Sequence, residues 1–146
     1  MSTPPLIFVL NGPNLNLLGT REPEVYGTDS LDDIAARLAE QAEELGVELD
    51  IRQSNHEGHL IDWLHEAQAR GAKAEILNPG GYSHTSVALY DAVKAIKTPV
   101  IEVHLSDPEA REAFRHTDLV ALAATRVIKG EGARGYALAL DAAARL

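Results

Sequence analysis

Short apolar runs alternate along the chain with segments of helical periodicity. Residues 6–10 (LIFVL) are a continuous apolar run followed by Asn-Gly-Pro-Asn, a pattern typical of a buried strand that ends in a loop. Residues 47–53 alternate apolar and polar positions, and residues 74–77 and 100–104 are two more short apolar runs. We expect a strand in each of these segments, and a final strand within residues 119–127.

Helical spacing is clearest between Ser30 and Gly46. Apolar residues recur every three or four positions between these two residues, Ser30 is a good N-cap, and Gly46 is a good helix stop. Similar but shorter patterns predict helices over residues 58–70, 85–96 and 134–146, and a short helix over residues 108–114.

Strands separated by helices in this order pair in parallel through right-handed crossovers. The pattern therefore predicts one α/β domain over residues 1–146. Its architecture would be a flavodoxin-like, doubly wound, five-stranded parallel sheet with helices on both faces.

Composition narrows the class of protein. No apolar run approaches the roughly 20 residues that cross a bilayer, and residues 1–5 lack the basic stretch of a secretory leader. Cysteine is absent, which excludes disulfides and thiolate chemistry and fits a reducing compartment. The net charge of −9 disfavours a nucleic-acid surface. We expect a cytoplasmic protein without membrane or nucleic-acid partners.

Polar residues collect where the predicted strands end, which is the edge at which open parallel sheets bind ligands. These segments are residues 11–16, 19–27, 54–58, 78–84 and 104–106. Each alone is a common turn sequence, but four successive strand ends offer Asn, His, Ser or Arg where a turn needs only Gly, Pro or Asp. Together they predict one site.

The segment from Gly19 to Gly27 is long for a loop that joins a strand to a helix, and it carries Arg21 and Tyr26. Such loops often close over a substrate. A tyrosine is a poor base at neutral pH, but guanidinium groups beside it favour the phenolate form. An Arg-Tyr lid is a candidate general base, and a static loop with Tyr26 packed on the core is the alternative.

Glu102 and His104 are two residues apart on one predicted strand and so share a face of the sheet. The carboxylate could orient the imidazole and raise its pKa, which suits a general acid. Chance alternation is the alternative. Arg111 and Arg115 are one helical turn apart on the predicted short helix and could hold an anion, although isolated arginines are usually solvated.

Metal binding is not indicated. His56 and His59 lack the helical His-Glu-x-x-His order, and His65 and His116 form no ligand set with them. We expect neither a metal nor an organic cofactor.

Several motifs in order resemble the type II 3-dehydroquinate dehydratases. The matching segments are residues 11–19 (NGPNLNLLG), Arg21 with Tyr26, residues 53–58 (QSNHEG), 78–86 (NPGGYSHTS), 102–106 (EVHLS) and 111–116. The resemblance covers nearly the whole chain. It implies a metal-free hydro-lyase of the shikimate pathway, and hence of aromatic amino acid biosynthesis, or of quinate breakdown. Such an enzyme eliminates water anti from 3-dehydroquinate, through an enolate, to give 3-dehydroshikimate.

The resemblance also implies roles for residues at the matching positions. Tyr26 would be the base, with Arg21 and Arg111 beside it. Asn14 would hold a water at the enolate oxygen, and His104 would protonate the leaving hydroxyl. The implied substrate contacts are Asn78, His84, Asp91, Leu105 through its backbone, Ser106, Arg111 and Arg115. Asp91 would reach the site of a neighbouring subunit, in a homododecamer built as a tetramer of trimers.

Four positions depart from the usual pattern of the family. Tyr90 replaces a common arginine, Asp118 a serine, Leu122 a proline and Arg126 a glycine. We expect these changes to lie away from the chemistry and to affect assembly contacts.

Two other functions remain open from the residues alone. The same fold could serve as a ligand-binding or signalling module without catalysis. A lysine could also act through an imine, and Lys129 is the only lysine near the end of a predicted strand.

Overall fold

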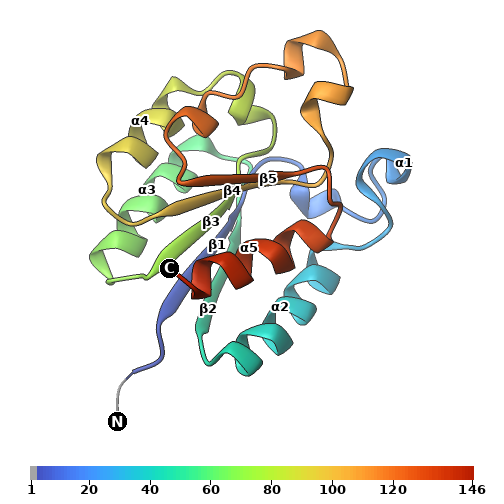
Figure 1. Cartoon of the computed structure of the whole chain (residues 1–146). Helices are drawn as coiled ribbons and strands as arrows, with labels where there is room; N and C mark the ends of the chain where they lie inside the picture. Colours follow the sequence, from blue (N-terminus) through green and yellow to red (C-terminus); the bar gives the residue numbers. More distant parts are fainter. Residues whose placement is uncertain (1–2) are drawn as a thin grey trace.

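The computed structural model describes residues 3–146 and contains a five-stranded sheet between two layers of helices (Figure 1). All neighbouring strands are parallel, in the order β2-β1-β3-β4-β5. The strands are β1 (Leu6–Asn11), β2 (Glu48–Gln53), β3 (Ala74–Asn78), β4 (Val100–His104) and β5 (Arg126–Lys129). This order confirms the predicted flavodoxin-like α/β fold. The expectation that residues 1–5 form no leader rests partly on residues 1 and 2, which lie outside the described residues.

The helices cover both faces of the sheet. Helices α2 (Leu31–Leu45) and α5 (Arg134–Ala144) lie on one face, and α3 (Glu57–Ala69) and α4 (Val87–Ala95) lie on the other (Figure 1). Side chains of β1 alternate between the two cores, which explains why its apolar run is continuous. Within residues 3–146, no helix combines the length and the apolar character that a membrane span requires.

The predicted start and end of α2 are confirmed. The Ser30 hydroxyl accepts a hydrogen bond from the Asp33 backbone N–H at 3.0 Å, and the Asp33 carboxylate accepts one from the Ser30 N–H at 3.0 Å. At the other end Gly46 adopts a left-handed conformation with φ of 70°. These contacts satisfy backbone groups that the helix itself leaves unpaired.

The prediction of a short helix over residues 108–114 was wrong. Two separate 3-10 turns, η3 (Pro108–Ala110) and η4 (Ala113–Arg115), stand there with Arg111 in an extended conformation between them. Phe114 is the large apolar side chain of this segment and is exposed, so the segment has no apolar face with which a regular helix could pack.

The final strand also lies later than expected. Only its first two residues fall within residues 119–127, because β5 begins at Arg126. The apolar residues before it form the 3-10 turn η5 (Val120–Leu122), with Val120 buried in the core beneath α3 and α4. The Leu119 N–H donates to the Ser83 carbonyl at 2.8 Å, which directs this segment to the helical layer and away from the sheet.

Candidate active site

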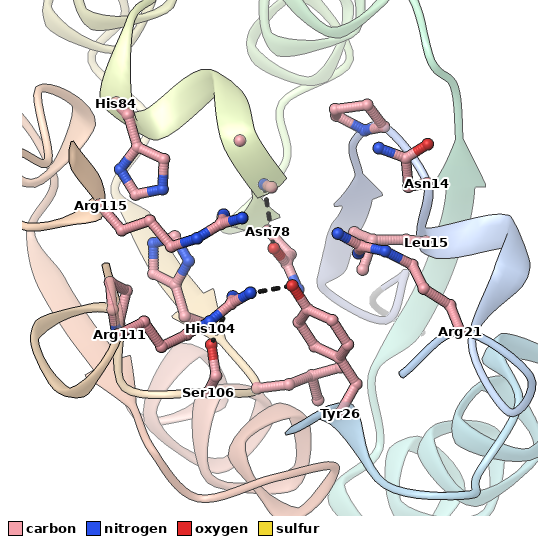
Figure 2. Close-up of a pocket in the computed structure, with 15 residues that line it drawn as sticks. Asn14, Leu15, Arg21, Tyr26, Asn78, His84, His104, Ser106, Arg111 and Arg115 are labelled. Atoms are coloured by element: carbon pink, nitrogen blue, oxygen red, sulfur yellow. Dashed lines mark hydrogen bonds between the residues drawn. The ribbon is translucent and has the colours of Figure 1, made fainter. Parts of the chain in front are cut away.

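A cavity of about 210 Å³ lies beyond the carboxyl ends of the central strands. All the site residues expected from the sequence line it except Asp91 (Figure 2). They are Asn14, Arg21, Tyr26, Asn78, His84, His104, Leu105, Ser106, Arg111 and Arg115. The parallel topology therefore brings together polar residues from segments far apart in the sequence.

Close contacts between loops shape the floor and one wall of this cavity. Gly12 follows β1 and donates its N–H to the Asn78 carbonyl at 2.8 Å. A Cβ at Gly12 would stand only 2.8 Å from the Pro79 carbonyl oxygen, so a larger residue there would force the loops after β1 and β3 apart. Next in the chain, Asn14 has a left-handed φ of 67° and donates its N–H to the Asn55 side chain at 3.0 Å.

Tyr26 lies between two arginines that line the cavity. Arg111 Nη1 donates a hydrogen bond to the Tyr26 hydroxyl oxygen at 2.8 Å. Arg21 Cζ lies 4.4 Å from the centre of the Tyr26 ring, and Arg111 Cζ lies 5.1 Å from it. Figure 2 shows the two arginines approaching the ring from different sides. A hydrogen bond from a cation to the phenol oxygen, with a second cation nearby, stabilises negative charge on that oxygen.

The segment that carries Tyr26 contains a short helix, α1 (Pro23–Tyr26). Tyr26 is partly buried against the core that α2 and α5 cover, while its hydroxyl reaches the cavity. Tyr26 therefore packs on the core, as the alternative interpretation expected, and it also lines the cavity.

His104 lines another part of the cavity and contacts two carboxyl groups that do not line it themselves. As expected from their spacing, Glu102 and His104 share a face of β4, and Glu102 Oε2 is hydrogen-bonded to His104 Nε2. Asp118 Oδ2 lies 3.4 Å from the same nitrogen. Burial alone would lower the pKa of His104, but the hydrogen bonds with Asp118 and Glu102 outweigh burial and raise it. The two carboxyl groups thus favour the protonated form of the imidazole.

The position of Asp118 corrects one expectation. The four departures from the family pattern were expected to lie away from the chemistry, yet Asp118 contacts His104 directly. Its segment, between η4 and η5, has neither the helical nor the strand periodicity that would have placed it at the site. The only available signal was the acidic residue itself, two positions after His116.

The same three groups are also of types that can bind a metal ion. Among residues 3–146, Glu102, His104 and Asp118 bring possible ligand atoms within 4.8 Å of one another. Two ligands about 2 Å from a tetrahedral ion stand about 3.3 Å apart. His104 Nε2 and Glu102 Oε2 are closer than that, at a spacing that suits a hydrogen bond better than two ligands of one ion.

A buried hydrogen-bonded chain supports Asn78 from below. The Tyr136 hydroxyl accepts from Asn78 Nδ2 at 2.9 Å and donates to Asn11 Oδ1 at 2.6 Å. Asn78 Oδ1 accepts the Gly80 N–H at 3.1 Å. These contacts fix the amide plane of Asn78 at the edge of the cavity. Tyr136 comes from α5 and was not among the predicted site residues.

His84 is oriented in a comparable way. Its Nδ1 lies 2.8 Å from the Thr117 carbonyl oxygen, which can only accept, so Nδ1 carries a proton and Nε2 is the second polar atom of the ring. Arg115 completes this wall, and its Nε donates to Glu112 at 3.0 Å. Among the described residues, those lining the cavity include three arginines and no carboxylate, a local field that favours an anion despite the net charge of −9.

Comparisons with known proteins agree with the resemblance drawn from the sequence. The family model described as dehydroquinase class II matches residues 5–144. The 3-dehydroquinate dehydratase of Phenylobacterium zucineum is 58% identical over 146 residues, covering 100% of this chain and 99% of that protein. That of Maricaulis maris is 60% identical over 137 residues, with 94% and 93% covered. The crystal structure of type II dehydroquinase from Propionibacterium acnes has a TM-score of 0.94 at 42% identity and full coverage of both chains.

Proposed function

The chain belongs to the class II dehydroquinase family and is a 3-dehydroquinate dehydratase, a hydro-lyase; from this premise we propose how its residues carry out the reaction. Membership decides against the non-catalytic alternative. The proposal concerns the base, the acid and the groups that hold the substrate, and it rests chiefly on the hydrogen bond between Arg111 and the Tyr26 hydroxyl.

Tyr26 is the general base. As a phenolate it takes the proton from the carbon beside the substrate ketone, and the electrons of that C–H bond form an enolate. Arg111 and Arg21 stabilise the phenolate before the transfer, because both guanidinium groups lie against the ring or its oxygen. The same cations then stabilise the negative charge that moves to the substrate. A water held at Asn14 donates to the enolate oxygen.

His104 is the general acid. When the enolate collapses to the conjugated enone, the C–O bond to the leaving hydroxyl breaks, and the proton from His104 makes that hydroxyl a neutral water. His104 Nε2 is engaged with carboxyl groups, so Nδ1–H is the donor that remains. Tyr26 and His104 enter the cavity from different elements, α1 and β4, and an anti elimination needs them to act on opposite faces of the substrate ring.

Substrate binding uses the rest of the cavity. Asn78, Ser106 and the backbone of Leu105 bind the substrate carboxylate, and His84, Arg111 and Arg115 bind its hydroxyls and share its charge. The Leu105 and Ser106 carbonyls accept N–H groups of Gly132 and Gly130 at 3.0 and 3.1 Å, which supports this segment from behind.

We also propose a homododecamer built from trimers, in which Asp91 completes a neighbour's site. Asp91 is exposed on α4 and does not line the cavity of its own chain. On the same chain, Val87 is 58% exposed on α4 and Leu122 is 75% exposed on η5, which packs against α4, so an apolar surface is available for a subunit contact. Mixing Tyr26→Phe with Asp91→Ala subunits should restore some activity if sites are shared, and no recovery would contradict the contact.

Adding 3-dehydroquinate to protein dialysed against a chelator tests the reaction itself. The expected result is steady formation of the conjugated enone, followed by ultraviolet absorbance, with no gain when metals are restored. Activity that returns only with a metal, or a lysine adduct trapped by borohydride, would contradict the proposed chemistry.

A further inference from the structure

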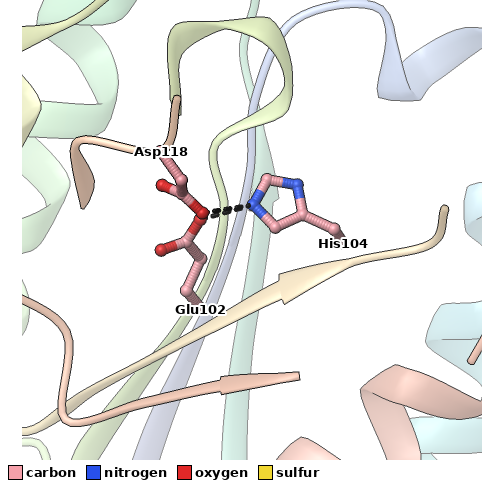
Figure 3. A group of neighbouring side chains, drawn as sticks. All are labelled: Glu102, His104 and Asp118. Atoms are coloured by element: carbon pink, nitrogen blue, oxygen red, sulfur yellow. Dashed lines mark hydrogen bonds and ion pairs between the residues drawn. The ribbon is translucent and has the colours of Figure 1, made fainter. Parts of the chain in front are cut away.

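Two carboxyl groups meet at one imidazole nitrogen beside the cavity. Figure 3 shows Glu102 and Asp118 both directed at Nε2 of His104. Glu102 comes from the same strand and is fully buried, whereas Asp118 comes from the segment before η5 and its side chain is 20% exposed. One cation cannot neutralise two adjacent carboxylates, so in such a space one carboxyl group keeps its proton.

The surroundings of the two carboxyl groups decide which one ionises. Glu102 Oε1 is buried and has no hydrogen-bond partner among residues 3–146. Asp118 is closer to solvent, and its Oδ1 accepts the Ala121 N–H at 3.1 Å. A carboxylate is stabilised by water and by donated hydrogen bonds, and it is destabilised by burial without partners. Asp118 is therefore the better site for the negative charge and Glu102 the better site for the proton.

The directions in which the two pKa values move agree with this geometry. Burial raises the pKa of Glu102; the hydrogen bond with His104 opposes this rise, and the contact with Asp118 adds to it. Burial also opposes ionisation of Asp118, but hydrogen bonds with His104 and Glu102 outweigh it and lower the pKa of Asp118. Neutral Glu102, anionic Asp118 and cationic His104 together carry no net charge, which lowers the cost of burying them.

We propose that Asp118 is a positioning residue that acts through His104. Asp118 is the ionised counter-ion of the imidazolium, and the protonated, neutral Glu102 carboxyl group orients the ring. This inference rests on the proposed function for its consequence in catalysis. An imidazolium with a dedicated counter-ion stays protonated above neutral pH and can donate Nδ1–H at each turnover.

Other charged groups around His104 act in the opposite direction. Arg21, Arg111 and Arg115 line the cavity together with Tyr26 and His84, and the three cations favour a neutral imidazole. Lys129 is next to His104 in the sheet, but its Nζ pairs with Glu109 Oε1 at 3.1 Å. A carboxylate is thus needed at His104 to offset the arginines that the substrate requires.

Two nearly isosteric variants separate Asp118 from Glu102. Asp118→Asn removes the charge and keeps an oxygen that can accept from Ala121, and Glu102→Gln replaces one neutral group by another. The measurement is the pKa of the His104 ring by nuclear magnetic resonance, with its signals assigned by their loss in His104→Asn. We expect Asp118→Asn to lower that pKa by about one unit or more, and Glu102→Gln to change it far less.

Asp33→Asn is the control for this measurement. It removes another carboxylate that accepts a backbone N–H but does not line the cavity, and it should leave the His104 pKa unchanged. Asp118→Ser serves if Asp118→Asn does not fold, with circular dichroism as the check. An unchanged His104 pKa in both Asp118 variants, or a larger fall in Glu102→Gln, overturns the proposal.

The pH profile of kcat distinguishes this inference from the proposed function. If His104 is the general acid, the alkaline limb moves to lower pH in Asp118→Asn by the same amount as the ring pKa. A fall in the ring pKa with an unmoved alkaline limb supports Asp118 as the counter-ion and contradicts the acid role of His104.

Discussion

Two fully buried glutamates on neighbouring strands, Glu75 and Glu102, have opposite surroundings. Both point to the face of the sheet that α3 and α4 cover, because Glu75 pairs in register with Phe8 and Val100, and Glu102 pairs with Leu77. Glu75 lies near the amino ends of the strands, and neither of its oxygens has a partner among residues 3–146. Glu102 lies near the carboxyl ends and contacts His104.

Burial alone raises the pKa of an acidic side chain without giving that side chain a function. Burial raises the pKa of Glu75 to about 9, and no other group contributes. At Glu102 burial also raises the pKa, but there His104 opposes the rise and Asp118 adds to it. A perturbed pKa therefore indicates a site only where partners and a cavity accompany it, as they do at β4.

The largest expected effect is on the pH dependence of stability, measured in Glu75→Gln. Folded Glu75 holds its proton up to about pH 9, whereas the unfolded chain releases it near pH 4.5, so the folded state binds more protons between these values and stability falls as pH rises. From pH 5 to pH 9 the wild type should lose on the order of 5 kcal/mol more unfolding free energy than the variant. Urea titrations at several pH values measure this difference, and parallel curves would mean that Glu75 has a partner.

His104→Ala should lower turnover by on the order of 10² or more, because it removes the group proposed to protonate the leaving hydroxyl. Glu75→Leu is the matched control, since it removes a buried acid from the same face and should leave turnover near the wild-type value. Steady-state kinetics at pH 7 measure both. A similar loss of turnover in the two variants would mean that the site around His104 matters no more for catalysis than the surroundings of Glu75.

A smaller effect is expected at Tyr136, a buried polar group with two partners. Tyr136→Phe leaves Asn78 Nδ2 and Asn11 Oδ1 without their shared partner and should cost about 1–3 kcal/mol of unfolding free energy. Glu75→Leu should have the opposite sign and stabilise the fold at pH 7. Denaturant midpoints, at equal m-values, measure the change in unfolding free energy of both variants. A stabilising Tyr136→Phe would mean that the two hydrogen bonds of the Tyr136 hydroxyl do not stabilise the fold.

Much of the fold could be predicted because local signals and tertiary packing agree. Local sequence predicts the same structure that packing stabilises at three places: the apolar run of β1, the Ser30 cap and the Gly46 stop. Local sequence patterns predicted the wrong secondary structure where tertiary contacts determine the conformation. Val120 is apolar because it packs beneath helices, so the run around it does not mark a strand, and the spacing of Arg111 and Arg115 resembles a helix that has no apolar face to hold it.

The site could be predicted to the extent that its residues follow strands. Parallel topology brings strand ends together, so Asn14, Asn78 and His104 could be grouped without a structure. Asp118 and Tyr136 could not, because one comes from an irregular segment and the other from a helix whose pattern signals only packing. Glu75 did carry a signal, because it is an acidic residue between the apolar residues Ala74 and Ile76 of a buried strand.

The central claim is that arginines make a phenol act as the base, and Tyr26→Phe tests it most directly. The ring and its packing remain, while the oxygen that accepts from Arg111 is lost. With 3-dehydroquinate at saturation and enone formation followed by ultraviolet absorbance, the account predicts a fall in turnover on the order of 10² or more in a fully folded variant. Turnover within a few-fold of the wild type would contradict it.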